Sequence, residues 1–200
     1  MIRLGLTGSI GMGKTTTAGL FAEAGIAVND ADAVVHDLYR GEAAPLVEST
    51  FPGTVVDGTV DRQRLSKHLS ANPADFKKLE AIIHPLVRQC ETLFLQRQGQ
   101  AGSDIVVLDI PLLFESAGTD RVDFIAVVSC DPQVQRRRVL ARPGMTEEKF
   151  NLILSRQMPD AEKRARADFI VDTGSGIDEA RRQVEAIIAA LRAGKTNRDG

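Results

Sequence analysis

Residues 8–15 read GSIGMGKT, which has the spacing glycine, four residues, glycine, lysine and then threonine. This spacing is typical of a phosphate-binding loop. Residues 3–7 before it are mostly apolar and predict a short buried strand, and residues 16–24 after it have apolar side chains at helical spacing. The loop is therefore predicted to join a strand to a helix, which is the context that a phosphate-binding loop requires.

Glycines in such a loop allow positive φ angles, so that consecutive backbone N–H groups turn toward one point at the positive end of the next helix. Phosphate oxygens fit that point. Lys14 can reach the β and γ phosphates, the Thr15 hydroxyl is a ligand for Mg²⁺, and Thr16 lies where it would contact the α phosphate. The residues predicted to bind ATP are Gly8, Gly11, Met12, Gly13, Lys14, Thr15 and Thr16.

The nucleotide is predicted to be ATP rather than GTP, because the chain has no Asn-Lys-x-Asp tetrad that would recognise guanine. A switch or motor protein would need partner modules that a chain of 200 residues does not display. The leading functional class is therefore a kinase that acts on a small molecule.

The fold is predicted to be α/β, a doubly wound parallel sheet with a phosphate-binding loop. Apolar runs of strand length at 104–110, 122–130 and 169–172 alternate with helical patterns at 132–141 and 177–192. Two segments interrupt this alternation, one of them helical except for a strand candidate that contains Asp57 and Gly58. We predict a nucleotide-binding core at 1–36, 103–141 and 167–192, a helical substrate domain at 37–102, a lid at 142–166 and a flexible tail at 193–200.

Composition narrows the possible partners. The chain has 25 Lys plus Arg against 27 Asp plus Glu, a net charge of −2, and two cysteines, Cys90 and Cys130, without metal-site spacing. Basic residues are concentrated between 136 and 166, which suits a small polyanion better than a nucleic acid. No apolar run is long enough for a membrane span and no signal peptide is visible, so we predict a cytoplasmic protein.

Acidic residues follow residues 26–29, which we predict to be the second strand. Asp30 and Asp32 lie two residues apart at its end, where open α/β sheets bind ligands. One carboxylate would act as the general base for an acceptor hydroxyl and the other would support it. The alternative is that Asp32 caps the helix that we expect to begin near Ala33.

Three further charged residues, Asp109, Arg138 and Arg142, are candidates for the predicted phosphate site. Asp109 ends an apolar strand, where a carboxylate acts on Mg²⁺ through water, although a turn-forming Asp would fit equally well. Arg138 and Arg142 lie four apart on one predicted helix and can face the transferred phosphoryl group together. His84 precedes a proline in the helical insertion, and its position alone favours a structural role.

Taken together, these motifs resemble the dephospho-coenzyme A kinase family. The similarity spans about residues 2–190, and it rests on the loop, His84-Pro85-Leu86, Gln157 and three longer segments, NDADAVVHDLY at 29–39, PLLFE at 111–115 and RPGMT at 142–146. The chain departs from the family pattern at Asn29, where an apolar residue is common, and at Thr173, where an asparagine near the adenine is frequent.

The resemblance implies transfer of the ATP γ-phosphoryl group to the ribose 3′-hydroxyl of dephospho-CoA, with Mg²⁺ bound near Thr15 and Asp109. It implies that Asp32 is the catalytic base, with Lys14, Arg138 and Arg142 supplying positive charge. The substrate side would comprise Asp32, Arg62, His84, Leu112, Leu113, Phe114 and Glu115. We expect a monomer or a weak homo-oligomer.

Two other functions compete with this one. Another small kinase, for shikimate or for a nucleoside monophosphate, would also pair the loop with carboxylates after the second strand. The glycine-rich triplet of shikimate kinases is absent, and the helical insertion suits a bulkier acceptor. A non-catalytic regulator that uses ATP-driven lid closure as a signal would need partner-binding features, and none is evident in the sequence.

Overall fold

The computed structural model describes residues 1–116 and 118–194, so that most of the predicted tail at 193–200 lies outside the described residues. The chain divides into two compact units. The first comprises Met1–Asn29 with Gln98–Gly200, and the second comprises Asp30–Arg97. Our finer division into core, substrate domain and lid stays a prediction.

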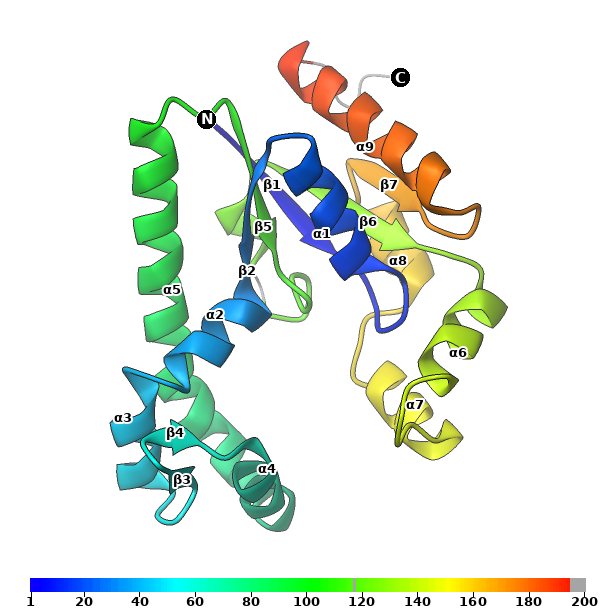
Figure 1. The fold of residues 1–200 in the computed structure, drawn as a ribbon. Helices are drawn as coiled ribbons and strands as arrows, with labels where there is room; N and C mark the ends of the chain where they lie inside the picture. Colours follow the sequence, from blue (N-terminus) through cyan, green and yellow to red (C-terminus); the bar gives the residue numbers. More distant parts are fainter. Residues whose placement is uncertain (117, 195–200) are drawn as a thin grey trace. The chain divides into compact units, whose positions relative to one another are not determined.

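A five-stranded sheet organises the first unit (Figure 1). Its order is β2-β5-β1-β6-β7, and β1 pairs in parallel with β5 and β6, as β6 does with β7. The continuous apolar runs of β5 and β6 are buried because helices cover the sheet. The predicted α/β fold is confirmed. The strands are β1 (Ile2–Thr7), β2 (Ala27–Asp30), β5 (Ile105–Asp109), β6 (Phe124–Ser129) and β7 (Phe169–Asp172).

The helices of this unit lie between its strands along the chain, except α9, which follows the last strand. Helices α1 and α9 contact each other, and α9 also packs on β7 (Figure 1). Side chains such as Phe21, Val128 and Ile187 form the core between these helices and the sheet. The elements are α1 (Lys14–Glu23), the 3₁₀ turn η2 (Thr119–Arg121), α6 (Pro132–Leu140), α7 (Glu147–Leu154), α8 (Asp160–Ala165) and α9 (Ile177–Arg192).

The second unit is mainly helical and has its own core, which includes Val47, Phe51 and Leu65. Asp57 and Gly58 have φ angles of 49° and 75°, the left-handed pair that a two-residue hairpin turn needs. The strand candidate seen in the sequence is therefore a short hairpin. The elements are α2 (Ala31–Leu38), α3 (Ala43–Thr50), β3 (Val55–Val56), β4 (Thr59–Val60), α4 (Arg62–Ala71), the 3₁₀ turn η1 (Pro73–Asp75) and α5 (Phe76–Gln100), which continues into the first unit.

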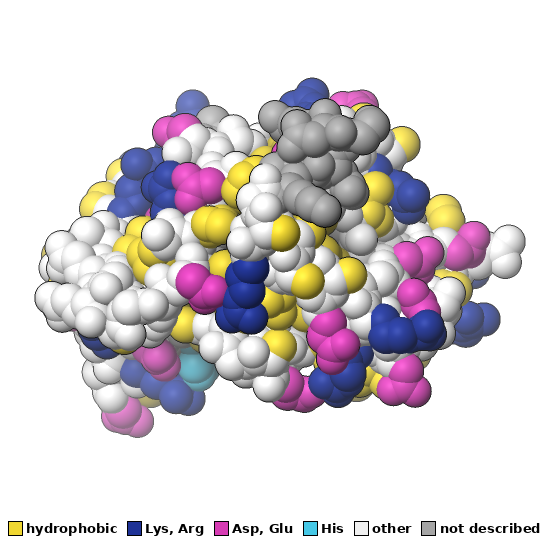
Figure 2. Space-filling view, turned by 90° about the horizontal axis from the view of Figure 1, so that it is seen from above, with side chains coloured by type: hydrophobic (Ala, Val, Ile, Leu, Met, Phe, Trp, Pro, Cys, Tyr) yellow, Lys and Arg dark blue, Asp and Glu magenta, His cyan; other side chains and the backbone are white. Residues whose placement is uncertain are grey.

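Surface charge is mixed on the face that Figure 2 shows, where Lys and Arg side chains are interspersed with Asp and Glu. This agrees with the small net charge of −2. Among the helices that the structure describes, none combines the length and apolar character that a membrane span needs.

Candidate active site

The phosphate-binding loop leaves the end of β1 and enters α1. Gly11 and Gly13 have φ angles of 78° and 97°, and Gly13 is the N-cap of α1. The Met12 N–H donates to the Ser9 carbonyl over 3.1 Å, which closes a turn within the loop. Residues other than glycine are strained at such φ angles. The loop therefore places backbone N–H groups at the positive end of α1, as an anion site requires.

Helix α6 packs tightly against this loop. A Cβ atom added to Gly11 would lie 2.4 Å from Val139 Cγ2 and 3.2 Å from the Gln135 carbonyl oxygen. Val139 is fully buried, so it has no free space into which to move. The path of the loop is consequently fixed by packing as well as by its own conformation.

Gly11→Ala is expected to raise the KM for ATP and to lower the melting temperature. The added Cβ requires a strained φ, which costs about 1–2 kcal/mol, and overpacking against Val139 costs about 1–3 kcal/mol more. Gly25→Ala is the matched control, because Gly25 has φ 81° with no atom within 4 Å of the added Cβ. Thermal unfolding and steady-state kinetics compare the two variants. Equal losses of stability and an unchanged KM would show that the loop tolerates the clash.

Lys14 and Asp109 form an ion pair at the start of α1. The Lys14 Nζ lies 2.5 Å from Asp109 Oδ1, and the two side chains are 14% and 1% exposed. Asp109 is the last residue of β5, and the Leu6 carbonyl of β1 accepts the Ile110 N–H beside it. The structure therefore brings together two residues that the sequence assigned to phosphate and metal chemistry.

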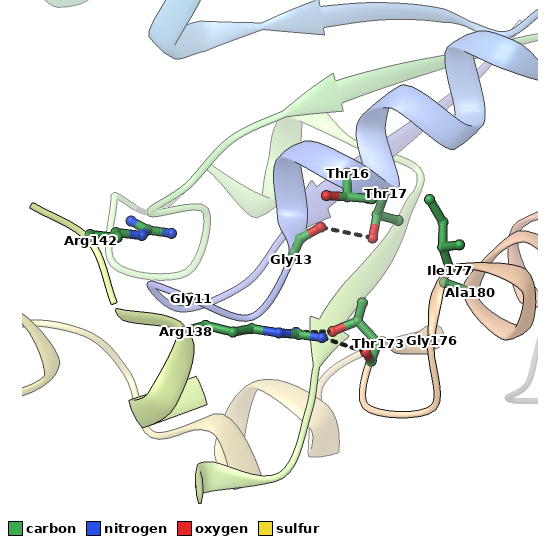
Figure 3. Close-up of a pocket in the computed structure, with 10 residues that line it drawn as sticks. All are labelled: Gly11, Gly13, Thr16, Thr17, Arg138, Arg142, Thr173, Gly176, Ile177 and Ala180. Carbon is green, nitrogen blue, oxygen red and sulfur yellow. Dashed lines mark hydrogen bonds between the residues drawn. The ribbon is translucent and has the colours of Figure 1, made fainter. Parts of the chain in front are cut away.

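A cavity of about 300 Å³ lies beside the loop in the first unit (Figure 3). The guanidinium of Arg138 runs along one wall, and Thr16 and Thr17 of α1 lie on another. Arg142 also lines the cavity. The expectation that both arginines lie on one helix is wrong, because α6 ends at Leu140, but both line one cavity. The lining residues are Gly11, Gly13, Thr16, Thr17, Arg138, Arg142, Thr173, Gly176, Ile177 and Ala180.

Thr173 connects the loop to Arg138. Its hydroxyl donates to the Met12 carbonyl over 2.7 Å and accepts from Arg138 Nη1 over 2.8 Å. The Thr173 carbonyl accepts from Arg138 Nη2 over 2.8 Å, so two parallel bonds fix the plane of the guanidinium (Figure 3). Thr173, which stands where the family frequently has asparagine, thus links Arg138 to the loop. The sequence held no signal for this contact.

Asp30, rather than Asp32, caps α2 in the second unit. Its carboxylate accepts the N–H groups of Asp32 and Ala33 over 2.8 and 3.1 Å, and the helix begins at Ala31. The alternative that Asp32 is the cap is therefore wrong, as is the helix start near Ala33. Asp32 is exposed in the first turn, and within the described part of the chain its carboxylate makes no hydrogen bond or ion pair.

Two predicted substrate residues belong to the same unit as Asp32. The Arg62 guanidinium lies 5.5 Å from the centre of the Tyr39 ring, a cation–π distance. Burial raises the pKa of Tyr39 above its usual value, and the positive charge of Arg62 offsets only part of that rise. His84 is exposed on α5, directly before a proline that the helix accommodates. Asp32, Arg62 and His84 thus lie in one unit, and Lys14, Asp109, Arg138 and Arg142 in the other.

The PLLFE segment follows β5, and not all of its side chains are exposed as a substrate-binding role would require. Leu112 is 44% exposed and Phe114 is partly buried. Leu113 is fully buried and packs beside Gly5 of β1, so the prediction that Leu113 faces a substrate is corrected. The Glu115 carboxylate accepts the Met158 N–H over 2.7 Å and lies 3.0 Å from Lys163 Nζ.

Two glutamines contact the loop, and neither contact was predicted from the sequence. Gln157 Oε1 accepts the Ile10 N–H over 3.1 Å, and Gln135 Nε2 donates to the Ile10 carbonyl over 2.8 Å. Gln157 entered the sequence analysis only through the family resemblance, and Gln135 not at all. Gln135 is buried in the structure, but α6 also carries Gln133 and three arginines, so its sequence does not single out Gln135.

Comparison with known proteins supports the same chemistry. Residues 2–179 match the family model described as Dephospho-CoA kinase. A protein of Rhizobium etli named Dephospho-CoA kinase is 62% identical over 192 residues, which cover 96% of this chain and 95% of that relative.

Solved structures agree. A Thermus thermophilus protein matches with a TM-score of 0.81 and 34% identity over 95% of this chain and 97% of the other. A Dephospho-CoA kinase of Campylobacter jejuni matches with a TM-score of 0.72 over 96% of this chain and 98% of the other, and at 23% identity it supports the fold alone.

Proposed function

The chain belongs to the dephospho-CoA kinase family, and we propose that its loop at 8–15 binds the ATP triphosphate while Asp32 accepts the proton of the acceptor hydroxyl. The reaction is phosphorylation of dephospho-CoA by ATP in the synthesis of coenzyme A, with the ribose 3′-hydroxyl as acceptor. The observation that carries this proposal is the glycine loop at the N-terminus of α1, with Lys14 and Asp109 paired beside it.

The ATP site supplies charge in two ways. Loop N–H groups and the Lys14 ammonium would neutralise the β and γ phosphates. We propose that the Thr15 hydroxyl binds Mg²⁺ and that Asp109 acts on the ion through water, because oxygen atoms are its preferred donors and the ion keeps several waters and phosphate oxygens. Thr15 is exposed and directly follows Lys14, whose ammonium contacts Asp109. When bound, Mg²⁺ would stabilise the charge that develops on the phosphoryl oxygens.

The cavity beside the loop suits the nucleoside of ATP. Its wall is the flat Arg138 guanidinium, which Thr173 holds by two hydrogen bonds, and a fixed guanidinium plane can stack on an aromatic base. Arg142 lines the same cavity. We propose that Arg142 also supplies positive charge to the transferred phosphoryl group. Arg138, which we expected to do the same, would lie at the base, at the opposite end of ATP from that group.

Thr173→Val is expected to raise the KM for ATP about fivefold with little change in kcat. The change removes a hydroxyl that bonds both Arg138 and Met12, and a lost hydrogen bond costs about 1 kcal/mol. Thr173→Ser retains the hydroxyl and is the matched control. Steady-state kinetics with varied ATP would measure both, and an unchanged KM in the valine variant would contradict the role of Thr173.

The acceptor side rests on Asp32. Because Asp30 supplies the cap of α2, the exposed Asp32 carboxylate is not needed to cap the helix. A general base needs such a carboxylate within reach of the hydroxyl that it deprotonates. We propose that Arg62, His84, Leu112 and Phe114 lie along the bound dephospho-CoA, as the family resemblance implies.

The experiment that tests this function measures ADP release with dephospho-CoA, shikimate and nucleoside monophosphates offered separately. We expect release only with dephospho-CoA, together with coenzyme A as product. Release with shikimate or a nucleoside monophosphate instead would favour the competing small kinases. A monomer or weak homo-oligomer stays our prediction, as does a cytoplasmic location.

A further inference from the structure

Glu115 and Lys163 form an ion pair in the first unit. Lys163 is fully buried and the Glu115 side chain is 17% exposed. Lys163 lies on α8, whereas Glu115 follows β5 in the PLLFE segment. The pair thus joins the end of the predicted lid to the segment that follows β5.

The Glu115 carboxylate is charged at neutral pH. Burial by itself would raise its pKa, but the Met158 N–H and the Lys163 ammonium outweigh burial and hold the pKa below its usual value. A buried ammonium is costly without a paired anion. The Glu115 carboxylate thus offsets the cost of burying Lys163 on α8 and also holds the Met158 N–H before that helix.

Gln157 extends this connection to the phosphate-binding loop. It directly precedes Met158, whose N–H bonds Glu115, and its own Oε1 accepts the Ile10 N–H. Gln135 bonds the Ile10 carbonyl from α6. The Ile10 backbone is consequently fixed by two side chains, immediately before Gly11.

We propose that Glu115 is a positioning residue for ATP: paired with Lys163, it sets the place of Gln157, which in turn fixes Ile10 in the loop. This inference rests on the proposed function of the loop, and it replaces our expectation that Glu115 contacts dephospho-CoA. The two roles make opposite predictions. A positioning residue alters ATP binding, whereas a substrate contact alters dephospho-CoA binding.

Glu115→Gln and Gln157→Ala test the proposal. The first keeps an acceptor for Met158 but removes the charge that pairs with Lys163, and the second removes the acceptor for Ile10. Each is expected to weaken binding of Mg²⁺ with a non-hydrolysable ATP analogue about five- to tenfold and to change the Kd for dephospho-CoA less than twofold. The double variant should lose little more than either single one, because both act through the same contact.

Isothermal titration calorimetry measures both ligands, and Glu162→Gln is the control, since it makes the same charge change at an exposed position of α8. If Glu115→Gln fails to fold, Gln157→Ala still decides. Weakened dephospho-CoA binding with normal ATP binding would overturn the proposal, as would additive losses in the double variant. Failure of the unchanged protein to bind the ATP analogue would instead refute the proposed function itself.

Discussion

Asp32→Asn is expected to lower kcat by at least about a hundredfold, the lower range of what a general base contributes. Asparagine has nearly the shape of aspartate but cannot accept the proton of the acceptor hydroxyl. The Kd for ATP should change little, because the loop, Lys14 and the nucleoside cavity belong to the other unit. Stability should also change little, since Asp32 is exposed and does not cap α2.

Asp30→Asn is the comparison that identifies the base. It makes the same chemical change two residues away, and asparagine caps a helix as well as aspartate does. Its kcat is expected to fall far less. Single-turnover rates and ATP binding, measured on both variants, separate chemistry from binding. Near-normal turnover in Asp32→Asn would remove the base assignment, and a larger loss in Asp30→Asn would transfer it to Asp30.

Lys14→Met is expected to lower kcat/KM for ATP by about a hundred- to a thousandfold, the loss found when one group that stabilises the transition state is removed. The methionine retains much of the side-chain volume but not the ammonium that faces the phosphates. The change also removes the cation from Asp109, which is 1% exposed, so the melting temperature should fall as well.

Lys14→Arg separates charge from shape at this position. It retains a cation near Asp109 but presents a planar fork instead of a compact ammonium. We expect it to recover much of the stability and little of the activity. Steady-state kinetics and thermal unfolding would measure the two properties, and wild-type kinetics in Lys14→Met would contradict the phosphate-binding role.

Local patterns in the sequence were sufficient to predict the loop and the sheet. In the motif, Gly13 has a positive φ that few other residues adopt, and at Gly8 an added Cβ would lie 2.7 Å from the Val128 carbonyl oxygen. The continuous apolar runs of β5 and β6 report burial on both faces of a parallel sheet. The motif and the apolar runs are patterns of neighbours along the chain, so they can be read without a structure.

Contacts between distant residues could not be predicted in this way. The Thr173 hydroxyl bonds Met12, 161 positions away, and no periodicity encodes such a pairing. The burial of Lys163 was equally hidden, because α8 reads as a charged, exposed helix. Helix starts are uncertain by a few residues, and that uncertainty was enough to leave Asp32 as an alternative cap of α2, a role that Asp30 has in the structure.

The proposed binding of the ATP triphosphate depends most on the backbone amides of the loop, and their NMR signals test this binding directly. Titration of the ¹⁵N-labelled protein with Mg²⁺ and a non-hydrolysable ATP analogue should shift the amide resonances of Gly11, Gly13, Lys14 and Thr15 more than those elsewhere in the chain, and the shifts should saturate at one nucleotide per chain. Unchanged loop amides, whether or not other resonances moved, would contradict the claim that this loop binds the triphosphate.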